Sequence, residues 1–199
     1  RWDAKNHPKS ESIFPIGNGR MGQRGNFEET YTGKSLQGSY IAGVYYPDKT
    51  RVGWWKNGYP EYFAKVLNSC NWIGIQVKVD GEELDLNTAT KVASFCRELD
   101  MQSGLLKRTF EATLPSGKIV AVEAERLVSI VQDEIGTISY SVTPKNFSGK
   151  IELCSYLDFD VKNEDSNYDE KFWEPVTQGE EAGASYVHAK TKKTGFEVT

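Results

Sequence analysis

Apolar and polar residues alternate through the middle of the chain. In residues 73–79, isoleucine or valine occupies every second position, and glycine, glutamine and lysine stand between them. The pattern recurs in residues 106–114, where one face carries Leu106, Phe110, Ala112 and Leu114. A period of two is typical of a β-strand that buries one face and exposes the other. We therefore predict a half-buried strand in each range.

Turn signals divide the rest of the chain at intervals of roughly ten residues. Asp80-Gly81 is a hairpin signal, and Pro115-Ser116-Gly117 marks another turn. Further strands are expected over residues 40–46, 119–131 with a bend near 123–125, 138–142, 151–159 and 185–190. Pro47 to Thr50 reads as a turn between strands. This spacing, with almost no helical period, predicts an all-β fold, an antiparallel β-sandwich with few short helices.

The N-terminal region carries a glycine motif that is often functional. Residues 1–12 are polar, and His7-Pro8 favours an extended entry. Gly17, Gly19 and Gly22 have the G-x-G-x-x-G spacing of dinucleotide-binding loops. Pro15 precedes them and Gly25 soon follows, so the strand and helix that such a loop needs are both interrupted. We predict a tight backbone turn and no nucleotide site.

Residues 52–60 form the most distinctive stretch, with three large aromatics among Gly53, Gly58 and a final proline. These breakers predict a loop. An indole offers a flat apolar face and one N–H donor, which suits a sugar ring or a protein surface. The alternative is that one tryptophan fills the core and the other covers the loop. Our candidate binding residues are Trp54, Trp55 and Lys56.

Composition excludes several classes of protein. The net charge is −4 and no basic stripe occurs, which argues against a nucleic-acid partner. No run of about 18 apolar residues exists, so no membrane span is expected. The N-terminus lacks the apolar core of a signal peptide, although the missing initiator methionine leaves a removed leader open. Cys70, Cys96 and Cys154 are widely spaced and odd in number, which indicates reduced, buried thiols in the cytoplasm.

Catalytic and metal-ligating groups are not arranged in any recognisable pattern. Residues 158–174 are rich in acids but lack calcium-loop spacing, so a solvated loop is expected, anchored by Phe172-Trp173. His7 and His188 form no metal-ligand pair and are expected to be exposed or locally hydrogen-bonded. We therefore assign no catalytic and no metal-binding residue. The residues alone support a β-sandwich with an aromatic loop that could bind sugar.

Several longer motifs resemble glycoside hydrolase family 65, and within it the maltose phosphorylase branch. They are Ile16-Gly17-Asn18 and residues 21–29, 35–40, 47–50, 52–60, 99–101, 104–106 and 161–168. The resemblance covers nearly the whole chain. Kojibiose, nigerose and trehalose phosphorylases share the implied architecture, and some relatives hydrolyse their substrates, so the α-glucoside and the choice between phosphorolysis and hydrolysis stay open.

The resemblance implies that residues 1–199 are an N-terminal domain of the supersandwich, galactose mutarotase type. The chain stops within an expected strand at 196–199, so truncation is expected. The family's (α/α)6 catalytic barrel, with its general acid and phosphate site, would lie outside this chain. The implied reaction is inverting phosphorolysis of maltose, with inorganic phosphate as co-substrate and no other cofactor, by a cytoplasmic homodimer. This chain alone would then be inactive.

Two functional hypotheses follow from the sequence. In the first, the chain is a non-catalytic domain that serves as scaffold and dimer contact, and its tryptophan loop reaches the rim of an active site. In the second, it is an autonomous carbohydrate-binding module that stacks Trp54 and Trp55 on sugar.

Overall fold

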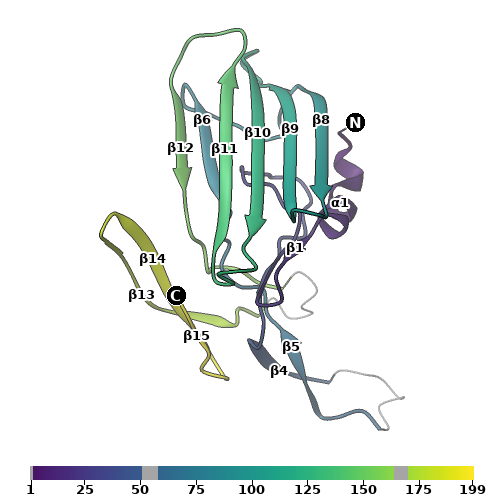
Figure 1. The fold of residues 1–199 in the computed structure, drawn as a ribbon, viewed down its shortest axis with the longest axis vertical. Helices are drawn as coiled ribbons and strands as arrows, with labels where there is room; N and C mark the ends of the chain where they lie inside the picture. The colour runs from purple at the N-terminus through teal and green to yellow at the C-terminus, as the bar shows by residue number, and fades with distance from the viewer. Residues whose placement is uncertain (1, 51–57, 164–169) are drawn as a thin grey trace.

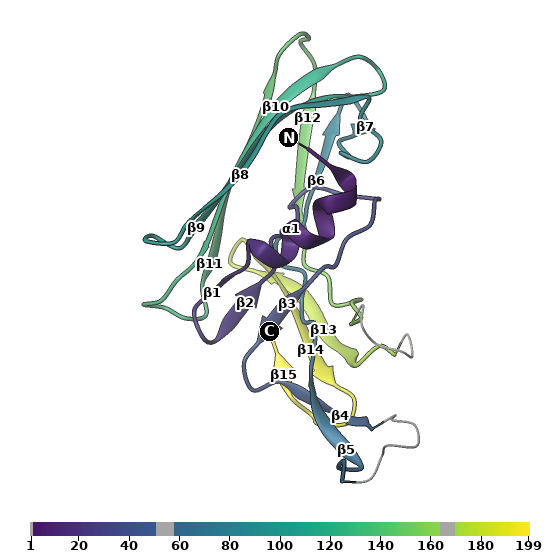
Figure 2. The ribbon, with the colours of Figure 1, turned by 90° about the vertical axis from the view of Figure 1, so that its right-hand side faces the viewer.

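The computed structural model describes residues 2–50, 58–163 and 170–199. In these ranges every strand pairing is antiparallel, and the one α-helix is short, α1 (His7–Ile13). A four-stranded sheet faces a three-stranded sheet across the core (Figures 1 and 2). The predicted antiparallel β-sandwich is confirmed. None of the helices in the described ranges has the length and apolar character needed to cross a bilayer.

The larger sheet is a meander in the order β11-β10-β9-β8. Its strands are β8 (Lys91–Asp100), β9 (Leu105–Thr113), β10 (Ile119–Val128) and β11 (Gly136–Pro144). The pairing of β9 with β10 shows no register shift, so the bend predicted near 123–125 does not interrupt the ladder. The prediction that β10 continues to residue 131 was wrong. Val131 lies in the connection to β11 and is 95% exposed.

The opposite sheet has the order β12-β6-β7, with β6 (Ile75–Val79), β7 (Glu82–Glu83) and β12 (Ile151–Ser155). Asp80 and Gly81 both have positive φ, at 49° and 83°, as the predicted two-residue hairpin requires. The strand predicted over 151–159 was too long. Strand β12 ends at Ser155, and Leu157 beyond it is exposed.

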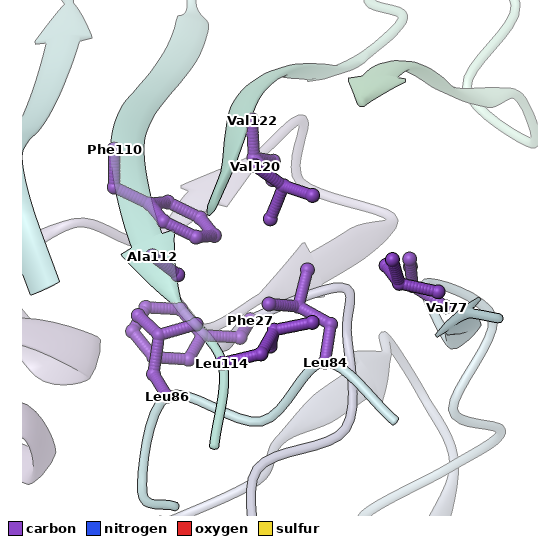
Figure 3. Close-up of a cluster of buried hydrophobic side chains, with 10 residues drawn as sticks. Phe27, Val77, Leu84, Leu86, Phe110, Ala112, Leu114, Val120 and Val122 are labelled. Atoms are coloured by element: carbon purple, nitrogen blue, oxygen red, sulfur yellow. The ribbon is translucent and has the colours of Figure 1, made fainter. Parts of the chain in front are cut away.

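The main core lies between these two sheets (Figure 3). It joins side chains from β6, β9 and β10 with others from the connecting segments. Its buried members are Phe27, Val77, Val79, Leu84, Leu86, Phe110, Ala112, Leu114, Val120 and Val122. The apolar faces predicted for residues 73–79 and 106–114 are thus confirmed as core faces.

The N-terminal segment departs from one prediction and confirms another. It contains η1 (Ala4–Asn6), α1, β1 (Ile16–Gly17), β2 (Met21–Gln23) and β3 (Ser39–Ile41). The extended entry was wrong: Pro8 lies in the first turn of α1, where a missing N–H costs nothing. The predicted glycine turn is confirmed between β1 and β2, where Gly19 has φ of 92°.

The strand predicted over residues 40–46 is two strands, because the chain turns at Gly43 with φ of 81°. The second of them is β4 (Tyr45–Lys49), which pairs with β5 (Tyr62–Val66). The turn predicted at Pro47 to Thr50 was therefore wrong. Pro47 lies inside β4, in a sheet of two strands, where its missing donor is tolerated.

The C-terminal residues form a third sheet, with β13 (Trp173–Glu181), β14 (Ala184–Thr191) and β15 (Glu197–Val198). The predicted strand over 185–190 is confirmed within β14. Phe172 and Trp173 are buried against Tyr46 and Leu67, so the predicted anchor is also confirmed.

A buried ionic network joins the N-terminal segment to the large sheet. The Arg108 guanidinium on β9 donates to both oxygens of Glu29, at 2.6 and 2.5 Å, and to Glu28 at 2.5 Å. Arg126 on β10 donates to the other Glu28 oxygen at 2.9 Å. The hydroxyl of Tyr140 donates to Glu29 at 3.1 Å. All four charged side chains are at most 4% exposed.

Two positive and two negative charges therefore offset one another inside the protein. Burial by itself would raise the pKa of Glu28, but the charges of Arg126 and Arg108 outweigh it and lower that pKa. The network stabilises the fold above the ordinary carboxyl pKa, and that contribution is lost as the pH falls through the lower folded value.

We predict that Arg108→Met strongly destabilises the chain, because it leaves Glu29 buried without a cation. The expected loss is about 3–5 kcal/mol in the free energy of unfolding, measured by urea denaturation. Lys107→Met is the matched control, since Lys107 is the preceding residue on β9 and forms an exposed pair with Glu125. It should change stability by less than about 1 kcal/mol. Equal losses in the two variants would contradict the assigned role of the network.

Candidate functional site

The three candidate binding residues, Trp54, Trp55 and Lys56, lie outside the described residues. Their role stays a prediction. The strands that lead into and out of this segment, β4 and β5, are described, and they place its two ends.

Residues 45–50 and 59–66 form a two-stranded hairpin, here called the arm. Its ladder runs from Tyr45 opposite Val66 to Lys49 opposite Tyr62. Beyond the ladder, the Thr50 N–H donates to the Glu61 carbonyl at 2.8 Å. The arm extends away from the four-stranded sheet (Figures 1 and 2). The described residues of the arm contribute no side chain to the main core.

The arm exposes several large apolar side chains. Tyr59, Tyr62, Phe63 and Val66 are 56, 51, 46 and 58% exposed. A group of apolar residues exposed on one element is typical of a contact surface, because covering it removes apolar area from water. The arm is thus suited to packing against another protein surface.

The base of the arm is fixed by the C-terminal sheet. Tyr46 is 2% exposed, and its hydroxyl donates to Glu170 at 3.0 Å. The Lys193 ammonium lies 4.7 Å from the centre of the same ring, a cation–π contact. The Thr194 hydroxyl donates to the Tyr45 carbonyl at 2.9 Å. Burial raises the pKa of Tyr46, so its phenol stays protonated and remains a donor.

Two residues after the end of β5, Asn68 organises a polar region. Its side-chain oxygen accepts from the Ser39 N–H at 2.8 Å, and its amide donates to the Gln37 side chain at 2.6 Å. Its backbone N–H donates to the Asn163 side chain at 2.9 Å, and its carbonyl accepts from the Trp173 indole at 2.8 Å. Four chain segments thus meet at one buried asparagine.

A cleft of about 430 Å³ lies over this region. It is lined by Gln37, Asn68, Asn71, Asp158, Asp160, Val161, Lys162 and Lys171. Within the described ranges, the buried Gln37 Nε2 donor and Asn71 Oδ1 acceptor have no hydrogen-bond partner. Amides and carboxylates of this kind can bind the hydroxyl groups of a sugar. The only sequence signal for this cleft was that residues 35–40 and 161–168 carry family-like motifs.

The histidine prediction was correct in part. His7 is only 2% exposed, so the prediction that it faces solvent was wrong. Its Nε2 lies 2.9 Å from Glu11 Oε1, four residues later, which is the expected kind of local contact. His188 Nε2 lies 3.5 Å from Glu197. In the part of the chain that the structure describes, no group of three histidine, cysteine or acidic side chains could hold a metal ion.

The cysteine prediction also needs correction. All three thiols are free, as predicted, but Cys96 and Cys154 are exposed instead of buried. Both lie on strands at positions that face solvent. Cys70, beside the polar cleft, is partly buried, and burial raises the pKa of its thiol to about 11.

Comparison with known proteins decides the family. The family profile described as "Glycosyl hydrolase family 65, N-terminal domain" matches residues 1–199. The chain belongs to this family. Maltose phosphorylase of Bacillus subtilis is 46% identical over 94% of the chain, and the α,α-trehalose phosphorylase of Thermoanaerobacter brockii is 35% identical over 94%. The chain spans about a quarter of the length of each.

A solved structure supports the same family at the level of the fold. It is provisionally named a kojibiose phosphorylase, from the human microbiome, and it superposes with a TM-score of 0.85 at 28% identity. The superposition covers 98% of this chain and 25% of that one. This family domain is therefore a small part of each of these larger proteins.

We predict that Cys70 reacts slowly with thiol reagents at pH 8. A pKa of about 11 against an ordinary 9.0 leaves about 100-fold less thiolate, and the thiolate is the reactive form. Labelling with a disulfide reagent, followed by mass spectrometry, should modify Cys96 and Cys154 first. The rate of Cys70 modification should increase as the pH rises toward 11. In urea, all three cysteines should be modified at similar rates. Labelling of Cys70 as fast as Cys96 at pH 8 would refute its burial.

Proposed function

We propose that the chain is the non-catalytic N-terminal domain of an inverting disaccharide phosphorylase, which converts maltose and phosphate to β-glucose 1-phosphate and glucose. The main support is the 46% identity to a maltose phosphorylase, higher than the 35% to a trehalose phosphorylase and 30% to the kojibiose phosphorylase of Halothermothrix orenii. The parent enzyme would act in the cytoplasm with inorganic phosphate as co-substrate, and its catalytic barrel would lie outside residues 1–199.

The electrostatics of the described residues support a non-catalytic role. A general acid needs a raised carboxyl pKa, so that it still holds its proton at neutral pH. Four described carboxyls have a shifted pKa, and each shift is downward: Glu11, Glu28, Asp80 and Asp100. These four carboxyls are therefore ionised at neutral pH and hold no proton to donate, which suits a structural role.

The arm gives this domain its proposed contribution to the parent enzyme. Its exposed apolar residues would pack against a second subunit, and the tryptophan segment at its end would reach an active-site rim. The polar cleft at its base lies on the same part of the domain and offers hydrogen-bonding groups to a sugar. The domain would thus be a scaffold and dimer contact that also borders the substrate.

We predict that the purified chain releases no glucose 1-phosphate from maltose and phosphate. The longer parent enzyme, assayed in parallel, is the positive control. Titration of the chain with maltose should show no stoichiometric binding. Turnover by the chain, free of contaminating enzyme, would refute the non-catalytic assignment. Tight binding that is lost in Trp54→Ala or Trp55→Ala would instead favour the autonomous carbohydrate-binding module.

We predict that paired Tyr62→Ser and Phe63→Ser substitutions weaken dimerisation of the longer parent enzyme. Aromatic residues in an interface often contribute more than 1 kcal/mol each, so the dissociation constant should rise at least about tenfold. Size-exclusion chromatography with light-scattering detection, over a range of protein concentrations, measures the change in the dissociation constant. The matched control is Ile130→Ser with Val131→Ser, since both are highly exposed in the β10–β11 connection, outside the arm. If the arm substitutions leave the dissociation constant of the dimer unchanged, the arm is not part of the dimer interface.

A further inference from the structure

A second, larger cleft of about 750 Å³ opens between α1 and β8. It is lined by Trp2, Asp3, Asn6, His7, Ser10, Phe14, Phe95, Cys96 and Arg97. The volume lies within the range of about 300–1,000 Å³ typical of small-molecule sites. Its lining combines aromatic rings with a few polar groups, the composition that such sites share.

Arg97 stands out because no carboxylate among the described residues is hydrogen-bonded to its terminal nitrogens. It lies directly opposite Arg108 in the pairing of β8 with β9. Arg108 is hydrogen-bonded to Glu28 and Glu29. Both terminal nitrogens of Arg97 are buried and have no hydrogen-bond partner among the described residues. Two like charges facing each other across strands are unfavourable unless each has a partner.

The surroundings of Arg97 compensate its charge only weakly. The guanidinium lies 5.1 Å from the centre of the Phe27 ring, 5.8 Å from Phe14 and 5.9 Å from Phe95. Aromatic faces attract a cation but accept no strong hydrogen bond. Burial, and after it the charge of Arg108, lower the pKa of Arg97 to about 10, although the charges of Glu28 and Glu11 act in the opposite direction. The terminal nitrogens of the guanidinium are therefore buried without a hydrogen-bonded anion among the described residues.

A second unpartnered nitrogen lines the same cleft. His7 is 2% exposed, and its Nδ1 has no hydrogen-bond partner in the described ranges. The Asp3 carboxylate accepts from the Lys5 N–H at 3.0 Å and from Asn6 Nδ2 at 2.7 Å, and it makes no hydrogen bond to the terminal nitrogens of Arg97. Of the aromatic walls, the Trp2 and Phe95 rings are 5.1 Å apart. Among the described residues, the cleft thus combines flat apolar walls with buried nitrogens that have no hydrogen-bond partner.

We propose that this cleft binds a monosaccharide that carries an anionic group, either phosphate or carboxylate. The anion would meet the Arg97 guanidinium, which turns from the phenylalanine rings toward the cleft and donates two parallel hydrogen bonds. The sugar ring would pack on the Trp2 and Phe95 walls, with Asn6 and Ser10 as partners for its hydroxyls. This site is separate from the arm and does not depend on the proposed phosphorylase role.

Isothermal titration of the 199-residue chain tests the proposal with glucose 6-phosphate and glucuronate as probes. At least one should bind saturably, and glucose and inorganic phosphate should each bind at least about tenfold more weakly. Arg97→Gln should weaken binding at least about tenfold while leaving the melting temperature of the free chain unchanged or higher, because it removes an unpaired buried charge. The matched control is Arg20→Gln, an exposed arginine paired at the surface with Asp133 and Glu134, which should bind normally.

A second variant keeps the test decisive if Arg97→Gln folds poorly. Ser10→Phe fills the cleft from α1 without altering Arg97, and it should abolish binding. The proposal fails if neither anionic sugar binds, if glucose or phosphate alone binds as tightly, or if Arg97→Gln or Ser10→Phe binds normally. It also fails if the chain binds the probes but the longer parent enzyme does not, since another protein segment would then occupy the cleft.

Discussion

The fold depends on the charge balance between Glu28 and Glu29 on one segment and Arg108 and Arg126 on the large sheet. An arginine buried in a sandwich core is unfavourable unless an anion accompanies it. Here the N-terminal segment supplies the anions, so the segment and the sheet each make burial of the other possible. Glu11 extends the connection, because its carboxylate accepts from the side chain of Asn26 at 2.9 Å and from the Leu36 N–H at 2.7 Å. The irregular N-terminal region is therefore an integral part of the core.

The same network explains why Arg97 is left over. Glu28 and Glu29 together satisfy two guanidiniums, and β8 brings a third directly opposite Arg108. Sequence order alone gives no hint of this excess, because the three arginines lie on three different strands. The imbalance becomes visible only when the pairing register is known, and it points to the cleft beneath α1.

The sandwich and its core strands could be predicted because strand periodicity is local. The alternation around Val77 and Phe110 shows directly which face is buried. Arg108 lies in the same alternating row as Leu106 and Phe110, so the register could have placed it inside, but the prediction named only the apolar residues of that face. The polar cleft could not be predicted, since Gln37, Asn71 and Asp158 come together only through tertiary pairing. Helix α1 was missed because Pro8 was read as a signal for extended chain and not as a helix-start residue.

The clamp at the base of the arm has a consequence for synthesis of the protein. Tyr46 is covered by Phe172, and Thr194 holds the carbonyl of Tyr45, a residue 149 positions earlier in the chain. A chain emerging from the ribosome therefore presents the apolar base of the arm to water until β13 and β14 have been made. During that interval the arm is a hairpin whose apolar side chains are exposed to solvent, and chaperones bind intermediates of this kind. Truncations that remove β13 and β14 should consequently be limited by aggregation, even though the main sandwich core is complete without them.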